Sequence, residues 1–341
     1  MVTLKDIADE AGVSIMTVSN VAHNRKNRVS PEMYRKIREI IEREHYVPSM
    51  TARSLVNDDS LIIGVITHMT PQNLGSTISD PFLSTFVDGI ESRTREAGYF
   101  LMIRSVEDAR ALEFLSRSWR LSGMILTGIF QDEFFEGVKR LGIPYVLIDS
   151  YVDLDQQDAC SIGLEDEKGG YIATKHLLEN GHRVIAFASP TIRSGGVVEQ
   201  RLLGYRRALE EYGVCFDPGL IFTQEISIED GRRLGHTLAE LENVTGIFAS
   251  ADILAAGIMT GLREMGVQVP RDKSIVGFDD NYLCQLTNPC LTTVHQDAEQ
   301  KGILAMDMIL AQLKNRPLEE RSVILPVSLV ERESVKNLNL Q

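Results

Sequence analysis

Ile15 and Met16 are large apolar residues at the start of a short predicted helix, 14–22. A rotation of about 100° per residue directs Val18 and Val21 inward. The same rotation turns three side chains outward, namely Met16, Ser19 and Asn20. Exposed apolar groups at a helix start suit contact with thymine methyl groups in a DNA major groove. The alternative is an ordinary helical subdomain whose apolar positions seal against another domain.

Two further helices are needed to position that segment. Thr3 can cap a first helix, which Gly12 ends in a left-handed conformation, and the second helix follows after a three-residue turn. Ser30, Pro31 and an acid at 32 begin a third helix. Helix, short glycine-containing turn and helix is the helix-turn-helix pattern.

No constellation of residues indicates catalysis, a metal or a cofactor. The cysteines, Cys160, Cys215, Cys284 and Cys290, contain no Cys-x-x-Cys pair, and the seven histidines contain no His-x-x-x-His pair. The chain lacks the Gly-x-Gly-x-x-Gly fingerprint, the phosphate-binding loop and the Gly-x-Ser-x-Gly elbow. We therefore expect no catalytic residue, no metal site and no cofactor.

The charge is divided unevenly along the 341 residues. The net charge is −13, but residues 1–57 hold nine Lys or Arg against seven Asp or Glu. A mildly basic head on an acidic body is compatible with a small DNA-binding module joined to a larger sensor. The N-terminus lacks the apolar core of a signal peptide, and the apolar runs are too short to span a membrane, so we expect a cytoplasmic protein.

Residues 61–341 alternate short β-branched runs with amphipathic stretches, which predicts parallel sheets covered by helices. The expected strands are 61–67, 100–103, 123–126, 144–148, 184–187, 246–249 and 274–278. The expected helices are 81–97, 108–116, 169–178, 200–212, 230–241 and 253–265. The length suits two doubly wound halves.

The head and the body both resemble the LacI/GalR family of repressors. The head motifs are Thr3-Leu4-Lys5-Asp6-Ile7-Ala8, Ala11-Gly12-Val13-Ser14, Thr17-Val18-Ser19, Val29-Ser30, Tyr46-x-Pro48 and Ala52-Arg53-Ser54-Leu55. The body motifs include Gly169-Gly170, His176-Leu177-Leu178, Gly181-His182-Arg183-Val184-Ile185, Arg201-Leu202-x-Gly204-Tyr205, Val276-Gly277-Phe278-Asp279-Asp280, Leu291-Thr292-Thr293 and Leu325-Pro326-Val327-Ser328-Leu329-Val330. The resemblance runs from Val2 to about Arg332.

The resemblance implies that the second helix reads the major groove. It also implies that 49–56 is a hinge helix inserting Leu55 into the minor groove. The expected DNA-binding residues are Thr3, Ser14, Ile15, Met16, Thr17, Ser19, Asn20, Arg28, Tyr46 and Leu55. The family often has Arg where this chain has Asn20.

For the fold, the resemblance implies an all-α helix-turn-helix head with a hinge helix, followed by an α/β body similar to type I periplasmic sugar-binding proteins. The expected domains are a head at 1–48, a hinge and linker at 49–60, a body at 61–332 and a tail at 333–341. The body would cross three times between two doubly wound parallel-sheet subdomains. We expect one subdomain at about 61–160 plus 291–322, and the other at about 161–290 plus 323–332.

An effector, a ligand that changes DNA binding, would occupy the cleft between these subdomains. Asp279 can accept hydrogen bonds from vicinal hydroxyls, and Arg201 can donate a planar fork. The resemblance places six residues at this cleft: Phe82, Glu165, Asp166, Arg201, Asp252 and Asp279. Glu165-Asp166 replaces a common Asp-Asn pair and Ala251-Asp252 replaces Asn-Asp, which shifts the site toward acid.

These features predict a ligand-responsive transcriptional repressor of carbohydrate-utilisation genes. It would bind a near-palindromic operator as a homodimer and take a sugar or a sugar derivative as effector. Three alternatives remain open: a sensor of a protein coregulator, an enzyme on an α/β scaffold, and a transport binding protein. Effector binding by the ligand-free protein separates the first alternative from our interpretation.

Overall fold

The computed structural model describes residues 2–22, 26–46, 60–68, 80–152 and 159–340. The chain divides into two compact units, a head at 1–60 and a body at 61–341. The expected hinge helix and Leu55 lie outside the described residues.

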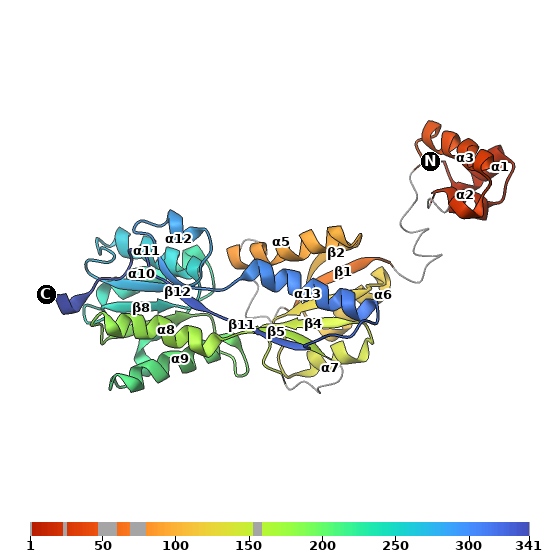
Figure 1. Ribbon diagram of the computed structural model, residues 1–341. Helices are drawn as coiled ribbons and strands as arrows, with labels where there is room; N and C mark the ends of the chain where they lie inside the picture. The colour runs from red at the N-terminus through yellow and green to blue at the C-terminus, as the bar shows by residue number, and fades with distance from the viewer. Residues whose placement is uncertain (1, 23–25, 47–59, 69–79, 153–158, 341) are drawn as a thin grey trace. The chain divides into compact units, whose positions relative to one another are not determined.

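The head is a three-helix unit with the predicted helix-turn-helix (Figure 1). Its elements are α1 (Leu4–Ala11), α2 (Ile15–Ala22), the 3-10 turn η1 (Lys26–Arg28) and α3 (Pro31–Arg43). Thr3 accepts a hydrogen bond from the N–H of Asp6, and the Asp6 carboxylate accepts one from the N–H of Thr3, which closes a capping box. Gly12 ends α1 at φ +73°. Ile7, Val18 and Ile37 meet in the core of the unit.

The first half of the body is a six-stranded parallel sheet in the order β11-β5-β4-β3-β1-β2. Its strands are β1 (Ile62–His68), β2 (Phe100–Val106), β3 (Gly123–Thr127), β4 (Tyr145–Ile148), β5 (Cys160–Leu164) and β11 (Ser322–Leu325). Helices α5 (Pro81–Glu96) and α13 (Ala298–Leu313) bury one face, and α6 (Ala109–Trp119) and α7 (Glu133–Arg140) bury the other.

The second half repeats this plan in the order β12-β10-β9-β8-β6-β7. Its strands are β6 (Ile185–Ser189), β7 (Ile221–Thr223), β8 (Gly246–Ala249), β9 (Ser274–Asp279), β10 (Thr292–His295) and β12 (Ser328–Val330). Helices α8 (Asp166–Glu179) and α9 (Val197–Glu211) cover one face, and α10 (Ile228–Glu240) and α11 (Asp252–Glu264) cover the other. The remaining short elements are η3 (Pro218–Leu220), α12 (Leu283–Leu286) and η4 (Leu338–Leu340). The predicted fold class is confirmed, with β12 as one antiparallel edge strand.

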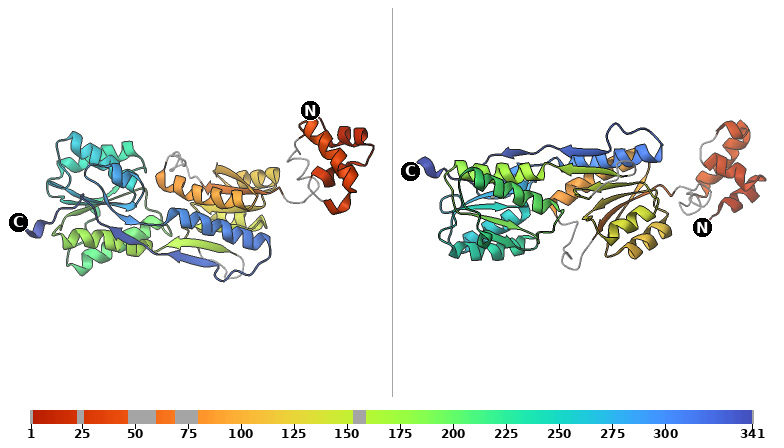
Figure 2. Two further views of the ribbon diagram at one scale, coloured as in Figure 1. Left: turned by 45° about the horizontal axis from the view of Figure 1, so that its top comes forward. Right: turned by 90° about the horizontal axis from the view of Figure 1, so that it is seen from below.

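The chain crosses between the halves three times, a few residues later than predicted at each crossing. β5 pairs with β4, so the first crossing follows Leu164 rather than residue 160. β10 pairs with β9, so the second follows His295 rather than residue 290. β11 pairs with β5, so the third lies between Leu325 and Ser328, where Figures 1 and 2 show β11 and β12 in succession. Strands of three to five residues give too little periodicity to be assigned to a sheet from sequence.

Two glycines set the distance between α8 and α9. A Cβ on Gly170 would collide with the backbone oxygen of Arg201, and a Cβ on Gly204 would collide with that of Glu167. The two helix backbones therefore touch, and this contact places Arg201 of α9 beside Asp166 at the start of α8.

The expected tail is part of the second half. Ser334 donates its hydroxyl to the carbonyl of Ile275, and Lys336 donates its N–H to the hydroxyl of Ser274. Leu338 donates its N–H to the carbonyl of Asn180. Among the described residues, no helix is both long and apolar enough to cross a bilayer.

Candidate DNA-binding and effector sites

The exposed face of α2 carries the two apolar residues predicted from sequence. Ile15 is 48% exposed and Met16 is 65% exposed within the described residues. Asn20 differs from the prediction, because it is only 9% exposed. The rotation of about 100° per residue along α2 alone places Asn20 on the outside. In the structure η1 packs against this helix. The face available for base contacts is therefore the start of α2.

The other predicted DNA-binding residues of the head fall into two groups. Thr3, Ser14 and Thr17 organise helix ends: the hydroxyls of Ser14 and Thr17 lie 2.9 Å apart, and Ser14 also accepts the N–H of Thr17. Arg28 is exposed on η1, and Ser19 is half-buried. Tyr46 is half-buried against the head core.

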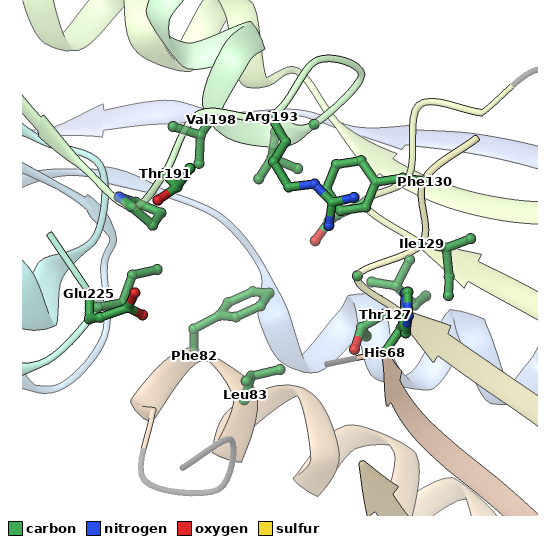
Figure 3. Close-up of a pocket in the computed structure, with 17 residues that line it drawn as sticks. His68, Phe82, Leu83, Thr127, Ile129, Phe130, Thr191, Arg193, Val198 and Glu225 are labelled. Carbon is green, nitrogen blue, oxygen red and sulfur yellow. The ribbon is translucent and has the colours of Figure 1, made fainter. Parts of the chain in front are cut away.

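A cavity of about 250 Å³ opens between the two halves of the body (Figure 3). The first half contributes residues from the carboxyl ends of β1, β3 and β4 and from the start of α5. The second half contributes the loops after β6 and β7 and the start of α9. The lining residues are His68, Phe82, Leu83, 127–130, Ile148, Asp149, Pro190, Thr191, Arg193, 196–198, Glu225 and Ile226. Strand ends of parallel sheets are the usual location of a ligand site.

Aromatic rings from the first half form part of the cavity wall. Phe82 lines the cavity, as predicted, and the ammonium of Lys301 lies 5.3 Å from its ring centre. Arg193, from the second half, stacks over Phe130 at 3.7 Å and approaches the carboxylate of Asp132 at 3.9 Å. This contact ties the two halves together across the cavity.

Behind the cavity, a chain of polar contacts joins the halves. Lys301 of α13 is fully buried and donates to both carboxylate oxygens of Asp149 at 2.8 Å. It also donates to Oε1 of Gln296 at 2.9 Å. Gln296 lies on the second crossing, and its amide donates to Oδ1 of Asp279 at 2.6 Å. Among the described residues, no donor reaches Oδ2 of Asp279.

Asp149 and Asp279, the two acids in this series of polar contacts, both lie at strand ends and have a positive φ. Asp149 follows β4 at φ +50°, and Asp279 ends β9 at φ +117°. Such backbone conformations are costly for residues other than glycine and concentrate at functional sites. Burial and the nearby carboxylate of Asp252 raise the pKa of Asp279 well above its ordinary value, although Arg201 opposes them.

Arg201 is the cation of a second buried group. Its Nε donates to Oδ1 of Asp166 at 2.8 Å, and one of its terminal nitrogens donates to the carbonyl of Ser250 at 2.7 Å. The guanidinium stacks over Phe278 at 3.5 Å. Tyr151 of the first half donates its hydroxyl to Oδ2 of Asp166 at 2.8 Å. Burial raises the pKa of Asp166, and Arg201 opposes that rise.

Of the six predicted effector residues, only Phe82 lines the cavity; Asp166, Arg201 and Asp279 are buried behind it, and Glu165 and Asp252 make other contacts. Glu165 pairs with Lys168 at 2.6 Å and accepts the N–H of Val327 on the third crossing. Asp252 is fully buried and accepts hydrogen bonds from Thr293, Cys284 and the backbone of Asn281. With no cation among these donors, burial raises the pKa of Asp252 to about 6. Both carboxylates hold segments of the body together.

Sequence reasoning missed several residues of the site. They are His68, Phe130, Asp149, Arg193, Glu225, Gln296 and Lys301. Asp149 had a usable sequence indication, because it directly follows the predicted strand 144–148. The stretch around Gln296 and Lys301 had none, because the helix 298–313 was not predicted.

A helix-turn-helix head joined to a two-lobed body with a cleft defines a class of DNA-binding regulators with a ligand-binding domain. The sequence pattern described as "Bacterial regulatory proteins, lacI family" matches residues 3–49, and "Periplasmic binding protein-like domain" matches residues 174–335.

Known proteins of this class match nearly the whole chain. It is 32% identical to the HTH-type transcriptional repressor PurR of Vibrio atlanticus, over 99% of this chain and 100% of that protein. The structure is similar to the lac repressor dimer bound to operator and an anti-inducer, with a TM-score of 0.81, 27% identity, and coverage of 98% of this chain and 99% of that one. A ribose-bound lacI family regulator from Enterococcus faecium matches with a TM-score of 0.71, 28% identity, and coverage of 81% and 99%. The chain belongs to the lacI family of bacterial regulatory proteins, as the sequence motifs indicated.

Proposed function

We propose that this protein is a ligand-responsive, DNA-binding repressor of carbohydrate-utilisation genes that acts in the cytoplasm and is not an enzyme. It binds a near-palindromic operator as a homodimer and takes a sugar or a sugar derivative as effector. The observation that carries the proposal is the joint presence of a helix-turn-helix with exposed Ile15 and Met16 and a body with a cleft between its halves, where aromatic and aliphatic side chains are joined by a few polar ones.

The effector occupies the cavity between the halves of the body. Phe82 supplies an aromatic surface for the face of a sugar ring. Asp279 supplies an acceptor for sugar hydroxyls from behind the lining residues, where the buried ion pair of Arg201 and Asp166 also lies. The ribose in the Enterococcus regulator supports a carbohydrate as the ligand class.

Effector binding changes how the halves close on each other, because both halves supply walls of the cavity. In a dimer, this closure changes how the two heads meet the operator. The operator-bound dimer of the lac repressor supports this arrangement. By linkage, an effector that weakens operator binding is bound more weakly by the operator complex.

Selection of binding sites from random duplexes, with and without a panel of sugars, tests the proposal. We expect enrichment of a two-fold symmetric site, with half-sites rich in thymine where the start of α2 meets the groove. Ile15→Ser with Met16→Ser should reduce the enrichment, whereas the exposed-surface change Arg117→Ser on α6 should not. A protein that selects no sequence, under any ligand condition, contradicts the proposal.

A further inference from the structure

When their ion-pair partners are counted, the ionisable residues that line the cavity carry a net negative charge. Four of the lining residues are ionisable: His68, Asp149, Arg193 and Glu225. Asp149 is neutralised by Lys301, which holds both of its oxygens. Arg193 faces Asp132 and stacks on a ring. Burial lowers the pKa of His68, which favours its neutral form at pH 7.

Glu225 lies on the exposed side of the cavity and is the lining residue left without a counter-charge. Among the described residues, no Lys, Arg or His nitrogen lies within 4 Å of its carboxylate. Figure 3 shows this side chain on the second half, with its carboxylate directed across the cavity toward Phe82 of the first half. A carboxylate facing an aromatic ring is a pairing that accommodates an ammonium group, by charge and by cation–π attraction.

The groups behind the cavity add to this negative balance. Asp166 accepts a hydrogen bond from Arg201 at 2.8 Å, and burial raises the pKa of Asp80, Asp166 and Asp279, which the guanidinium of Arg201 opposes. Uncompensated buried charge is unfavourable, so a positive group brought by a ligand lowers the energy of this region.

The start of α9 is the feature that would favour an anion instead. The first turn of a helix attracts negative charge, and residues 196–198 line the cavity. That turn already carries Glu199, whose carboxylate accepts the N–H of Gly195 at 2.8 Å. The partial positive charge at the start of α9 is therefore already balanced by Glu199.

We propose that the effector is an amine-bearing sugar, whose ammonium group lies between Glu225 and the ring of Phe82. This inference rests on the proposed function, because it assigns the chemical class of the ligand to the same cavity. The cavity volume of about 250 Å³ is just below the usual range of small-molecule sites and suits a ligand the size of a monosaccharide.

Titration calorimetry on the full chain, with sets of matched sugars, tests the inference. One set is D-glucosamine, D-glucose and D-glucose 6-phosphate, and a second is the corresponding galactose series. We expect at least one amine to bind about tenfold more tightly than its parent sugar and its phosphate. Glu225→Gln should remove that preference, because the amide keeps the shape but loses the charge.

Arg193→Gln is the matched control, because it changes the opposite charge on the same wall. It should retain or increase the preference for the amine. The inference is overturned if no amine exceeds its parent sugar, if a phosphate binds best, or if Glu225→Gln keeps the preference. Binding of neutral sugars alone would overturn only the amine assignment, while loss of operator selection would count against the proposed function.

Discussion

The two halves of the body place an aspartate at the same point of the same strand order, yet the two side chains are held differently. β4 and β9 are each the third strand of their sheet. Asp149 follows β4 and Asp279 ends β9, both with positive φ. Both oxygens of Asp149 accept hydrogen bonds from the ammonium of Lys301. Within the part of the chain that the structure describes, the side chain of Asp279 has only the neutral amide of Gln296, on one oxygen.

This difference separates a structural role from a binding role. A buried carboxylate with a full complement of cationic donors has little capacity left for a ligand. A buried carboxylate with an unused oxygen retains that capacity, and its charge raises the energy of the empty site. We infer that Asp149, although it lines the cavity, mainly fixes the first half around Lys301, whereas Asp279, which lies behind the lining residues, keeps one oxygen for effector hydroxyls.

The largest expected effect is a loss of stability on removing Lys301, the cation that binds Asp149. Lys301→Met should lower the free energy of unfolding by about 3–5 kcal/mol, because it leaves Asp149 buried without its partner. Urea denaturation of the full chain measures this loss. Lys168→Met, which removes an exposed pair with Glu165, should cost at most about 0.5 kcal/mol and serves as the control. Equal losses in the two variants would remove the structural role given to Lys301.

The two aspartates should also respond unequally to the same substitution. Asp149→Asn should cost about 1–3 kcal/mol, because the ammonium of Lys301 loses its counter-charge. Asp279→Asn should cost less than about 1 kcal/mol, because an amide oxygen can still accept from Gln296 and a buried charge is lost. Denaturation curves of the two variants under one set of conditions test the order, and a larger loss for Asp279→Asn would reverse the comparison.

For effector affinity we expect the opposite order: the substitution of Asp279 should have the larger effect. Asp279→Asn should weaken effector binding about tenfold, because an amide can accept from fewer hydroxyls than a carboxylate. Calorimetry should show this while operator binding without effector stays near that of the wild type, since the head is a separate compact unit. Wild-type effector affinity in Asp279→Asn would exclude this residue from the site.

A smaller, pH-dependent effect should distinguish the free energies of unfolding of Asp279→Asn and the wild type. Burial raises the pKa of Asp279 above its ordinary value of 3.8. Folded protein therefore binds more protons at this residue than unfolded protein, and its contribution to stability falls as pH rises above about 4. Asp279→Asn should gain stability relative to the wild type between pH 5 and pH 8. A difference that does not change with pH would show that Asp279 is not buried as an uncompensated acid.

Sequence patterns were sufficient for the architecture and for part of the site. Helix caps at Thr3 and Ser30 and short apolar runs such as 246–249 gave the elements close to their observed bounds. Asn20 was misplaced because tertiary packing after α2 buries it. Asp252 was placed in the cleft by analogy, whereas its partners come from β10 and the segment after β9, which no local pattern reveals. Lys301 lies in a helix that was not predicted, and no local pattern shows that the fold places Asp149 opposite it.

The central claim is that occupancy of the cavity controls operator binding. The direct measurement is fluorescence anisotropy of the selected operator duplex with the full chain, titrated with and without the effector identified by calorimetry. We expect the effector to change the operator Kd by at least about fivefold in the wild type and by much less in Asp279→Asn at the same effector concentration. An operator Kd that is unchanged when the cavity is saturated with effector would show that occupancy of the cavity does not control operator binding.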